Sequence, residues 1–387
     1  MTNSNEILNL NSFSQLAKVH EPVCLSLYLP TYRAGQEVKQ AMAPKTLKNL
    51  LKSVRTELAE RELTENEIEA FLRPVVNLLD DKKFWTEQSD GLSIFLTESD
   101  IEYYKIPIPF EPFHYVADHF YLKPLVPILN RDDIFYLLAF SPVMVHLYEC
   151  TPYTIAEIES DELPGRLEDV VGYDKVPNNL QQRSGQDAHG GAVYHGHGSK
   201  KDTREIEMEK FLHAVDNGIN KILSDQTIPL ILAADEKSTG KYRKINEYNS
   251  LVKDFIPGNP EGKDVLLLHE IAYDKLKSFF DEKKQAKIKA FLDNSTSKKV
   301  KSEMTDIVPA SVNGRVDTLF MNKDKEAYGL FDKENNSVII DNARLPQNAS
   351  LYNMMAVNTL LNKGNVYLMD ADDMPLKNTN ANALLRY

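Results

Sequence analysis

The chain has 387 residues, which is too many for one ordinary hydrophobic core, because single domains usually hold about 100 to 200 residues. Hydrophobic residues make up 42% of the chain and charged residues 26%, as in soluble globular proteins, and no stretch reaches the ~18 apolar residues of a membrane span. The net charge of −12 disfavours a general nucleic-acid coat protein, since such proteins neutralise phosphates with Lys and Arg. Any contact with RNA must therefore come from local basic patches.

The start of the chain and its cysteines indicate the compartment. The first ten residues, MTNSNEILNL, lack the basic start, apolar middle and small-residue cleavage site of a secretory signal, so we expect a cytoplasmic protein. Its two cysteines, Cys24 and Cys150, each lie in an apolar run. This favours buried, reduced thiols over a disulfide framework, and neither thiol has basic neighbours that would lower its pKa for catalysis.

The first segment predicts a strand followed by two helices. Residues 23–29 (VCLSLYL) are strand formers that end before Pro30. From Pro44 onward apolar residues recur at spacings of three and four, as on the buried face of a helix, and the capping-box sequence TENE begins a second helix at Thr64. The predicted buried positions are Leu47, Leu51, Val54, Leu58, Ile68, Phe71, Leu72 and Val75.

Two basic regions stand out on this acidic chain. One is a stripe along a face of the first helix, where basic residues recur at spacings of three, four and three over about three turns. A stripe of this kind is a candidate phosphate-binding surface, and the alternative is an ordinary solvated helix face. The stripe residues are Lys45, Lys48, Lys52 and Arg55, and the second region holds Lys283, Lys284, Lys287 and Lys289.

Alternating strands and helices predict a mixed α/β (α+β) fold. We place domain boundaries near Asn130 and Lys263, where the pattern changes. Expected strands cover 91–96, 103–108, 134–140, 143–148, 229–234, 315–321, 337–340 and 365–370. Expected helices include one capped by Asp202, one at 242–252, two at 265–280 and 281–294, and one at 350–362, with Gly364 in the left-handed position after it.

Residues 164–203 interrupt this pattern. They hold few large apolar side chains, contain QQRSGQDAHGGAVYHGHGSKKDT, and are predicted to form a long mobile loop. His-rich tracts can bind metal, but HGHG lacks the additional Cys or carboxylate ligands of a structural zinc site, so we predict no metal. The histidines concerned are His189, His195 and His197. The chain has no phosphate-loop lysine motif, dinucleotide-binding fingerprint or HExxH, and no cofactor is expected.

The C-terminal residues carry a family resemblance. GRVDTLFM, then LYNMMAVNTLLNKGNVYLMDADDMP, then NANALLRY follow in an order similar to the last domain of bacterial proteins related to archaeo-eukaryotic release factors and Pelota. Upstream, SLYLPTYR, GLSIFL, FYLKPLVPIL, PLILAADE and YRKINEY also look like this family. The chain thus resembles the bacterial archaeo-eukaryotic release factor family, in the branch called type three, over nearly its whole length.

The resemblance implies three domains and a place of action. Residues 1–130 would form a divergent domain at the decoding position, and 131–262 a central domain like the one that carries Gly-Gly-Gln in release factors. Residues 263–387 would form a ribosomal-protein-like α/β/α sandwich that recruits a translational GTPase such as elongation factor Tu. The implied partner is the ribosome, through rRNA and tRNA in the A site, with no role for membrane or DNA.

The central loop bears on chemistry. Peptide release needs a slender loop that exposes its backbone and a Gln that positions water, and Gly185 with Gln186 are the candidates. A Gly-Gly-Gln triplet is absent, because Ser184 stands at its first position, and this puts hydrolysis of peptidyl-tRNA in doubt. Candidate RNA contacts in the loop are His195, His197, Lys200 and Lys201, beside the helical stripe.

The leading hypothesis is a ribosome-binding translation factor, acting in ribosome rescue by peptide release or in ribosome hibernation. The missing triplet favours binding over hydrolysis. One rival is a stand-alone hydrolase or metalloenzyme built on the His-rich loop, which predicts turnover without ribosomes. Another is a non-catalytic protein-interaction module, suggested by the acidic surface, which predicts no dependence on RNA.

Overall fold

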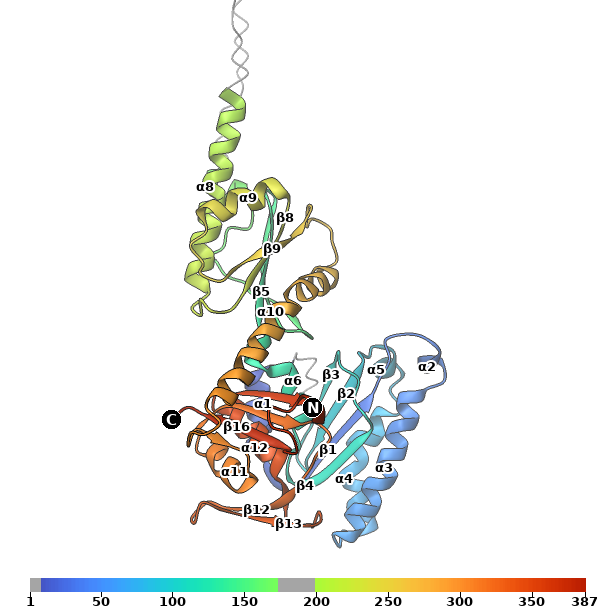
Figure 1. The fold of residues 1–387 in the computed structure, drawn as a ribbon. Helices are drawn as coiled ribbons and strands as arrows, with labels where there is room; N and C mark the ends of the chain where they lie inside the picture. The colour runs from blue at the N-terminus through green and yellow to red at the C-terminus, as the bar shows by residue number, and fades with distance from the viewer. Residues whose placement is uncertain (1–7, 173–198) are drawn as a thin grey trace, which may run out of the picture. The chain divides into compact units, whose positions relative to one another are not determined.

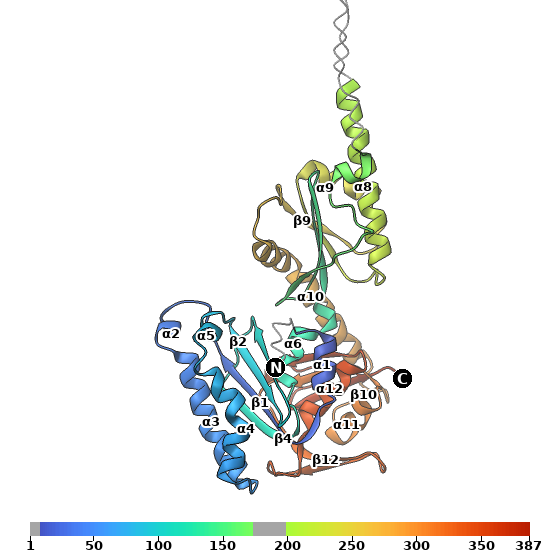
Figure 2. The same cartoon turned by 180° about the vertical axis from the view of Figure 1, so that it is seen from behind.

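A computed structural model describes residues 8–172 and 199–387. The predicted mixed α/β class is confirmed (Figures 1 and 2). The chain divides into two compact units, one formed by Met1–Asp132 with Phe280–Tyr387 and the other by Asp133–Phe279. The first and last segments of the chain therefore share one unit. The division into three domains at 130 and 262 stays a prediction.

In the first unit, the N-terminal segment forms an antiparallel sheet in the order β3-β2-β1-β4. Helices α3 (Met42–Glu60) and α4 (Glu65–Leu78) pack on it, and the apolar positions predicted for α3 are all buried against Leu25, Leu27 and Leu29. The capping box at Thr64 is present, with Glu67 accepting from the Thr64 amide at 2.8 Å. The other elements are α1 (Leu10–Leu16), β1 (His20–Pro30), α2 (Gln36–Lys39), α5 (Lys82–Thr86), β2 (Gly91–Leu96), β3 (Ile101–Ile106) and β4 (Phe113–His119).

The C-terminal part of this unit has a mixed sheet in the order β10-β16-β11-β15, in which β11 and β15 run parallel and α12 (Leu351–Leu361) lies between them in the chain. Phe291 of α10 packs edge-on against Phe320 of β11, which stacks on Tyr367 of β15. A small sheet, β13-β12-β14, completes the unit. The bounds are α10 (Val265–Asp293), β10 (Val300–Lys301), α11 (Met304–Val312), β11 (Val316–Asn322), β12 (Tyr328–Asp332), β13 (Ser337–Asp341), β14 (Ala349–Ser350), β15 (Asn365–Met369), η3 (Ala371–Asp373) and β16 (Ala381–Leu385).

Gly364 has a different role from the one predicted. The residue with positive φ after α12 is Lys363 (φ 62°), so the left-handed position falls one residue earlier. Glycine is required at 364 because a Cβ there would lie 2.7 Å from Thr359 Cγ2 and 2.8 Å from the Val316 carbonyl oxygen. Close approach of the backbone to β11, rather than an unusual dihedral angle, therefore excludes a side chain.

The second unit is built on a five-stranded sheet in the order β7-β6-β5-β8-β9. The predicted hairpin is confirmed, since β5 and β6 pair antiparallel up to Ser141 and Met144, whereas β5, β8 and β9 run parallel. Helix α8 buries Phe211, Val215 and Ile219 against this sheet. The bounds are β5 (Phe135–Ser141), β6 (Met144–Cys150), β7 (Ile155–Glu157), α7 (Leu167–Val171), α8 (Ser199–Ile222), β8 (Leu230–Ala234), α9 (Glu236–Ile245) and β9 (Leu251–Pro257).

The helix predicted at 242–252 is wrong from residue 246 onward, and the observed helix begins earlier, at Glu236. Helix α9 ends at Ile245, and Asn246 turns to an extended conformation with ψ 128°. The chain leaves the helix because the buried Asp216 carboxylate accepts from the Glu247 amide at 3.1 Å. Tyr248 is buried and its hydroxyl donates to the carbonyl of Ile228 at 2.7 Å, which positions β9 beside β8. A tertiary contact thus overrides the local helical pattern.

Two further helix predictions need correction. Helix α8 begins at Ser199, so Asp202 lies in its first turn instead of capping it, and α7 lies within the segment predicted as a loop. The two helices predicted at 265–280 and 281–294 are one continuous helix, α10. No Gly or Pro occurs within α10, so nothing in its local sequence forces a break.

Both cysteines are free and buried, as predicted. Burial raises the pKa of the Cys24 thiol to about 11 and that of Cys150 further, so neither has the thiolate character of a nucleophile. Among the described residues, the helices are too short or too polar to cross a membrane.

Candidate nucleic-acid interface

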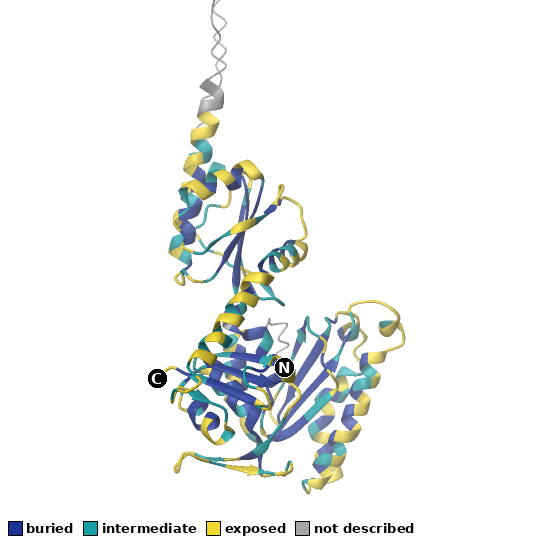
Figure 3. Ribbon diagram, in the orientation of Figure 1, coloured by how far each residue is buried: buried dark blue, intermediate teal, exposed yellow. Residues whose placement is uncertain are grey.

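The basic stripe lies on the outer face of α3, where Figure 3 shows exposed residues recurring along the helix. Lys45, Lys48 and Lys52 are exposed, and within the described part of the chain none of them forms an ion pair. Their charges are therefore available to a ligand. The packing of Leu47, Leu51 and Val54 on the sheet holds the three lysines at fixed spacing, because the helix can present only its opposite face to solvent.

Arg55 differs from the three lysines. Its guanidinium contacts Glu69 of α4 in a fork, with distances of 2.8 Å from Nε and 3.4 Å from Nη2. Side-chain hydrogen bonding to Arg55 lowers the pKa of the Glu69 carboxyl, which favours its ionised form. The stripe that can meet phosphate is thus three lysines long, and Arg55 ties α3 to α4.

The second basic region on α10 is partly engaged within the fold. Lys283 lies 2.9 Å from the buried Asp132 carboxylate, and Lys287 lies 3.1 Å from Asp317. These two lysines hold the part of α10 after Phe280 to the first unit. Two of the four lysines of this region are therefore paired within the fold.

A pocket opens beside the stripe, with a volume of about 400 Å³. Lys48 of the stripe lines it together with Lys82 and Trp85 of α5 and with Tyr32. Sequence reasoning missed this site, because Lys82 and Lys48 lie far apart in the chain and only the packing of α5 beside the start of α3 brings them to one cavity. The available signal was the clustering of KKFW around the only tryptophan of the chain.

The candidate residues of the central loop are not part of this geometry. Gly185, Gln186, His189, His195 and His197 lie outside the described residues. Lys200 and Lys201 fall in the first turn of α8, whose backbone is described, but their side chains are not. Among the residues that the structure does describe, no group of three His, Cys, Asp or Glu side chains could hold a metal ion.

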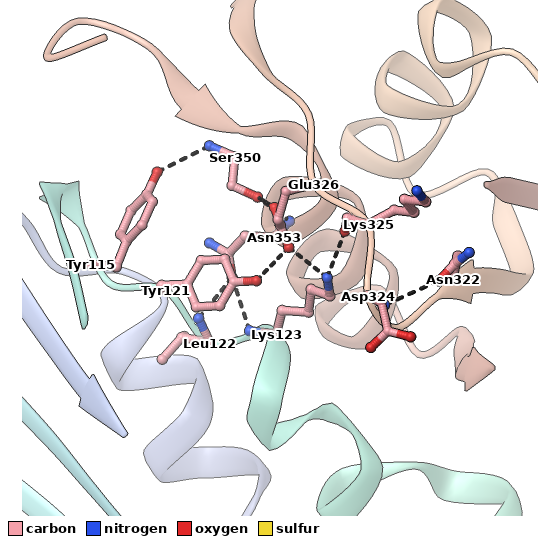
Figure 4. Close-up of polar contacts among 10 residues, drawn as sticks. All are labelled: Tyr115, Tyr121, Leu122, Lys123, Asn322, Asp324, Lys325, Glu326, Ser350 and Asn353. Atoms are coloured by element: carbon pink, nitrogen blue, oxygen red, sulfur yellow. Dashed lines mark hydrogen bonds and ion pairs between the residues drawn. The ribbon is translucent and has the colours of Figure 1, made fainter. Parts of the chain in front are cut away.

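A polar cluster lies elsewhere in the first unit, around the partly buried Glu326 (Figure 4). Its Oε1 lies 2.5 Å from Lys123 Nζ and accepts from the Tyr121 hydroxyl at 2.5 Å, while Oε2 accepts from Ser350 Oγ at 2.6 Å. Lys123 also donates to the Lys325 carbonyl at 2.9 Å. Burial, and then the adjacent Glu326 carboxylate, raises the pKa of Tyr121 well above its usual range, which keeps it a neutral donor.

Asn353 of α12 extends the cluster to the backbone. Its Oδ1 accepts from the amides of Leu122 (2.7 Å) and Lys123 (3.0 Å), and its Nδ2 donates to the Phe120 carbonyl at 3.1 Å. It therefore caps the start of η1 (Lys123–Leu125), which precedes α6 (Val126–Leu129) and η2 (Arg131–Asp133). Because the partners in this cluster satisfy one another in a buried place, we assign it to holding the first and last segments together rather than to binding.

Comparison with known proteins bears on the second unit. Residues 135–278 match the model of Bacterial archaeo-eukaryotic release factor family 7, a range that lies inside Asp133–Phe279 and covers nearly all of it. No curated protein is significantly similar to the chain. The broader resemblance predicted from the sequence motifs is confirmed. The branch whose model matches is family 7, where the motifs had suggested type three.

Solved structures give weak likenesses over much of the chain. They include the archaeal translation termination factor aRF1 (12% identity, 98% of this chain and 99% of that one, TM-score 0.26). Archaeal Pelota, from a model of ribosome-bound Pelota and ABCE1, has 13% identity over 74% and 72%, with TM-score 0.36. Dom34 of S. cerevisiae, described as interacting with Hbs1, has 14% identity over 77% and 73%, with TM-score 0.35.

No residue role is taken from these structures, because TM-scores this low do not establish a common arrangement. The family model matches the central unit of the chain. Over residues 135–278, this chain is similar to the bacterial archaeo-eukaryotic release factors of family 7.

Proposed function

We propose that the protein is a cytoplasmic, ribosome-associated translation factor that binds the A site, either to rescue stalled ribosomes by peptide release or to occupy idle ribosomes in hibernation. The observation that carries the proposal is the match of the central unit to a release-factor family. In this proposal the first segment lies near the decoding region, residues 184–186 act near the peptidyl-transferase centre, and the C-terminal segment recruits a translational GTPase.

The stripe on α3 supports contact with RNA. Three exposed lysines on consecutive turns, without internal partners among the described residues, suit the regularly spaced phosphates of an RNA backbone. A net charge of −12 makes such a local patch the main source of attraction, and it also opposes binding to RNA at random. Binding is therefore expected to depend on this face of α3.

A test of Gln186 distinguishes peptide release from hibernation on the ribosome. Ser184 in place of the first glycine of Gly-Gly-Gln favours occupancy over hydrolysis. Loss of peptidyl-tRNA cleavage in Gln186→Ala, with ribosome binding retained, assigns peptide release. Absence of cleavage with the unchanged protein, on ribosomes carrying peptidyl-tRNA, assigns hibernation.

The test of the proposal is sucrose-gradient sedimentation of the tagged full-length protein from growing and starved cells. We expect cosedimentation with 70S ribosomes. The triple variant Lys45→Glu/Lys48→Glu/Lys52→Glu should bind purified ribosomes more weakly. Its plot of log affinity against log salt should be shallower by about two to three units, because each phosphate contact contributes about 0.7 to 0.9.

The matched control is Lys298→Glu/Lys333→Glu/Lys377→Glu, which makes the same change in charge at exposed positions of the same unit. Both triple variants should keep the free energy of unfolding within about 0.5 kcal/mol of wild type, as exposed substitutions do. Protein that remains in the soluble top fractions in every growth state, even after crosslinking, overturns the proposal. Equal weakening by both triple variants removes the stripe from it.

A further inference from the structure

We propose that the pocket beside the stripe binds one unstacked nucleobase of single-stranded RNA. This pocket, named here the α3–α5 pocket, is lined by Tyr32, Val38, Met42, Lys48, Lys82, Trp85 and Gln88, among others. The inference rests on the proposed RNA-binding function. It adds a site that contacts the face of a base, whereas the stripe contacts only phosphates.

The size and the walls of the α3–α5 pocket suit a flat apolar group. Its volume of about 400 Å³ lies within the range of small-ligand sites, roughly 300 to 1,000 Å³. Val38, Met42 and Leu79 give it apolar walls, and two aromatic side chains, Tyr32 and Trp85, also line it. Aromatic side chains at a cavity wall are the usual platform on which proteins stack an unpaired base.

Trp85 is fixed within the fold and remains partly exposed at the pocket. Its indole N–H donates to the Leu78 carbonyl at 2.6 Å, and Phe84 contacts it edge to face at 5.0 Å. The polar atom of the indole is thus already satisfied within the fold, while the side chain stays only partly buried at the pocket. Fixing the ring in advance lowers the entropy lost when a base stacks on it.

Gln88 supplies an unused polar group. Its Nε2 donates to the Phe84 carbonyl at 2.6 Å, which fixes the orientation of the amide. Its Oε1 is buried and has no hydrogen-bond partner among the described residues. A buried acceptor without a partner is unfavourable, and a base offers an N–H donor on its Watson–Crick edge. Gln88 thus leaves an unpaired acceptor at the wall of the pocket, which Trp85 also lines.

The charges around the pocket suit the phosphates on either side of that base. Lys48 and Lys82 are exposed, and neither forms an ion pair within the described ranges. Glu37 is the only carboxylate among the lining residues, and it is exposed on α2. Because Lys48 belongs to both the pocket and the stripe, a strand whose base enters the pocket continues along Lys45 and Lys52.

The experiment uses the single tryptophan of the chain as the probe. The full-length protein is titrated with hexaadenylate RNA and with a hexameric ribose-phosphate chain that lacks bases, while the fluorescence of Trp85 is recorded. Stacking predicts saturable quenching by hexaadenylate only. The chain without bases should bind about 5- to 150-fold more weakly, since that is the contribution of one stacked base.

Two variants localise the effect. Thr86→Phe places a ring at the pocket and should abolish quenching. Its control is Thr56→Phe on α3, because Thr56 is also exposed and its hydroxyl also bonds a backbone carbonyl of the preceding turn. Lys82→Glu should weaken hexaadenylate binding and reduce the salt slope by about one unit.

The pocket proposal fails if the chain without bases quenches Trp85 and binds as strongly as hexaadenylate does. It also fails if Thr86→Phe and Thr56→Phe lose the same amount of quenching. Suppose that hexaadenylate does not quench Trp85, but the stripe variant binds ribosomes more weakly than wild type. The pocket proposal then fails and the proposed function stands. If the stripe variant keeps full ribosome binding but hexaadenylate still quenches Trp85, the α3–α5 pocket stands and the role of the stripe on the ribosome fails.

Discussion

The stripe on α3 and the cluster around Glu326 both depend on lysine, yet they use it in opposite ways. The side chain of Lys123 is 5% exposed, touches Glu326, and lies 5.2 Å above the ring of Tyr352. Lys45, Lys48 and Lys52 are exposed without partners among the described residues. A buried charge must be paired to be tolerated, so it stabilises one fold, whereas an exposed unpaired charge is free to meet a ligand.

The same contrast occurs across the single helix α3. Its exposed face carries the stripe, while Glu57 near its end lies 2.7 Å from Arg344 Nη2 and 3.3 Å from His114 Nε2. Arg344 also lies over the ring of Tyr115 at 4.3 Å and donates to the Val116 carbonyl. One helix thus separates charges that hold the first and last segments together from charges that remain available.

The largest expected effect is at Glu326. Glu326→Ala leaves Lys123 buried without its counterion, and about 3 kcal/mol of unfolding free energy should be lost, near the low end for buried pairs because Glu326 is 24% exposed. Urea unfolding of the full chain measures it, with the exposed Glu334→Ala as control. Replacing both partners, Lys123→Met/Glu326→Leu, should recover much of the loss. A loss of equal size in the control would remove the distinction between buried and exposed charge.

Two glycines, Gly364 and Gly240, allow a comparison between a crowded and an open position. Gly364→Ala should lower the free energy of unfolding by about 1 to 3 kcal/mol, because its Cβ would overlap Thr359 and the backbone of β11. Gly240→Ala is the matched change in α9, where a Cβ meets open space, and it should stabilise by roughly 0.5 to 1 kcal/mol. Thermal unfolding reports both signs. Two changes of the same sign would contradict the close approach assigned to Gly364.

The smallest effect should appear as a pH dependence at Glu57. Burial raises the pKa of its carboxyl, but the hydrogen bond from His114 and the charges of Arg344 and Arg61 outweigh burial and lower the pKa below 4.5. Ionised Glu57 therefore stabilises the fold above pH 4.5, and this stabilisation is lost as the pH falls through the lowered pKa.

Wild type should accordingly be more stable than Glu57→Gln near neutral pH, with the difference shrinking in acid. Glu60→Gln, on the exposed side of α3, controls for removing a negative charge. Chemical unfolding at a series of pH values measures the difference. A gap between wild type and Glu57→Gln that stays constant into acid would place the stabilisation in packing instead of charge.

Local signals were sufficient for much of the fold. The spacing of Leu47, Leu51, Val54 and Leu58 determined the buried face of α3, and the Thr64 capping box determined the start of α4, because both depend on residues within one or two turns. The strands of the β5–β6 hairpin and the burial of both cysteines were likewise readable. The ordered motifs near the C-terminus indicated the release-factor relationship, which the family model then supported through a different part of the chain.

Tertiary structure decided what local signals could not reach. Sequence shows a lysine but not its partner, so only the fold separates Lys287, paired with Asp317, from Lys52, which is exposed. The end of α9 at Ile245 depends on contacts with residues distant in the chain, such as the one between Asp216 and the Glu247 amide. The pocket of Trp85, Lys82 and Lys48 likewise exists because α5 packs beside the start of α3. Pairing and cavities arise between segments far apart in sequence, and no pattern of neighbouring residues encodes them.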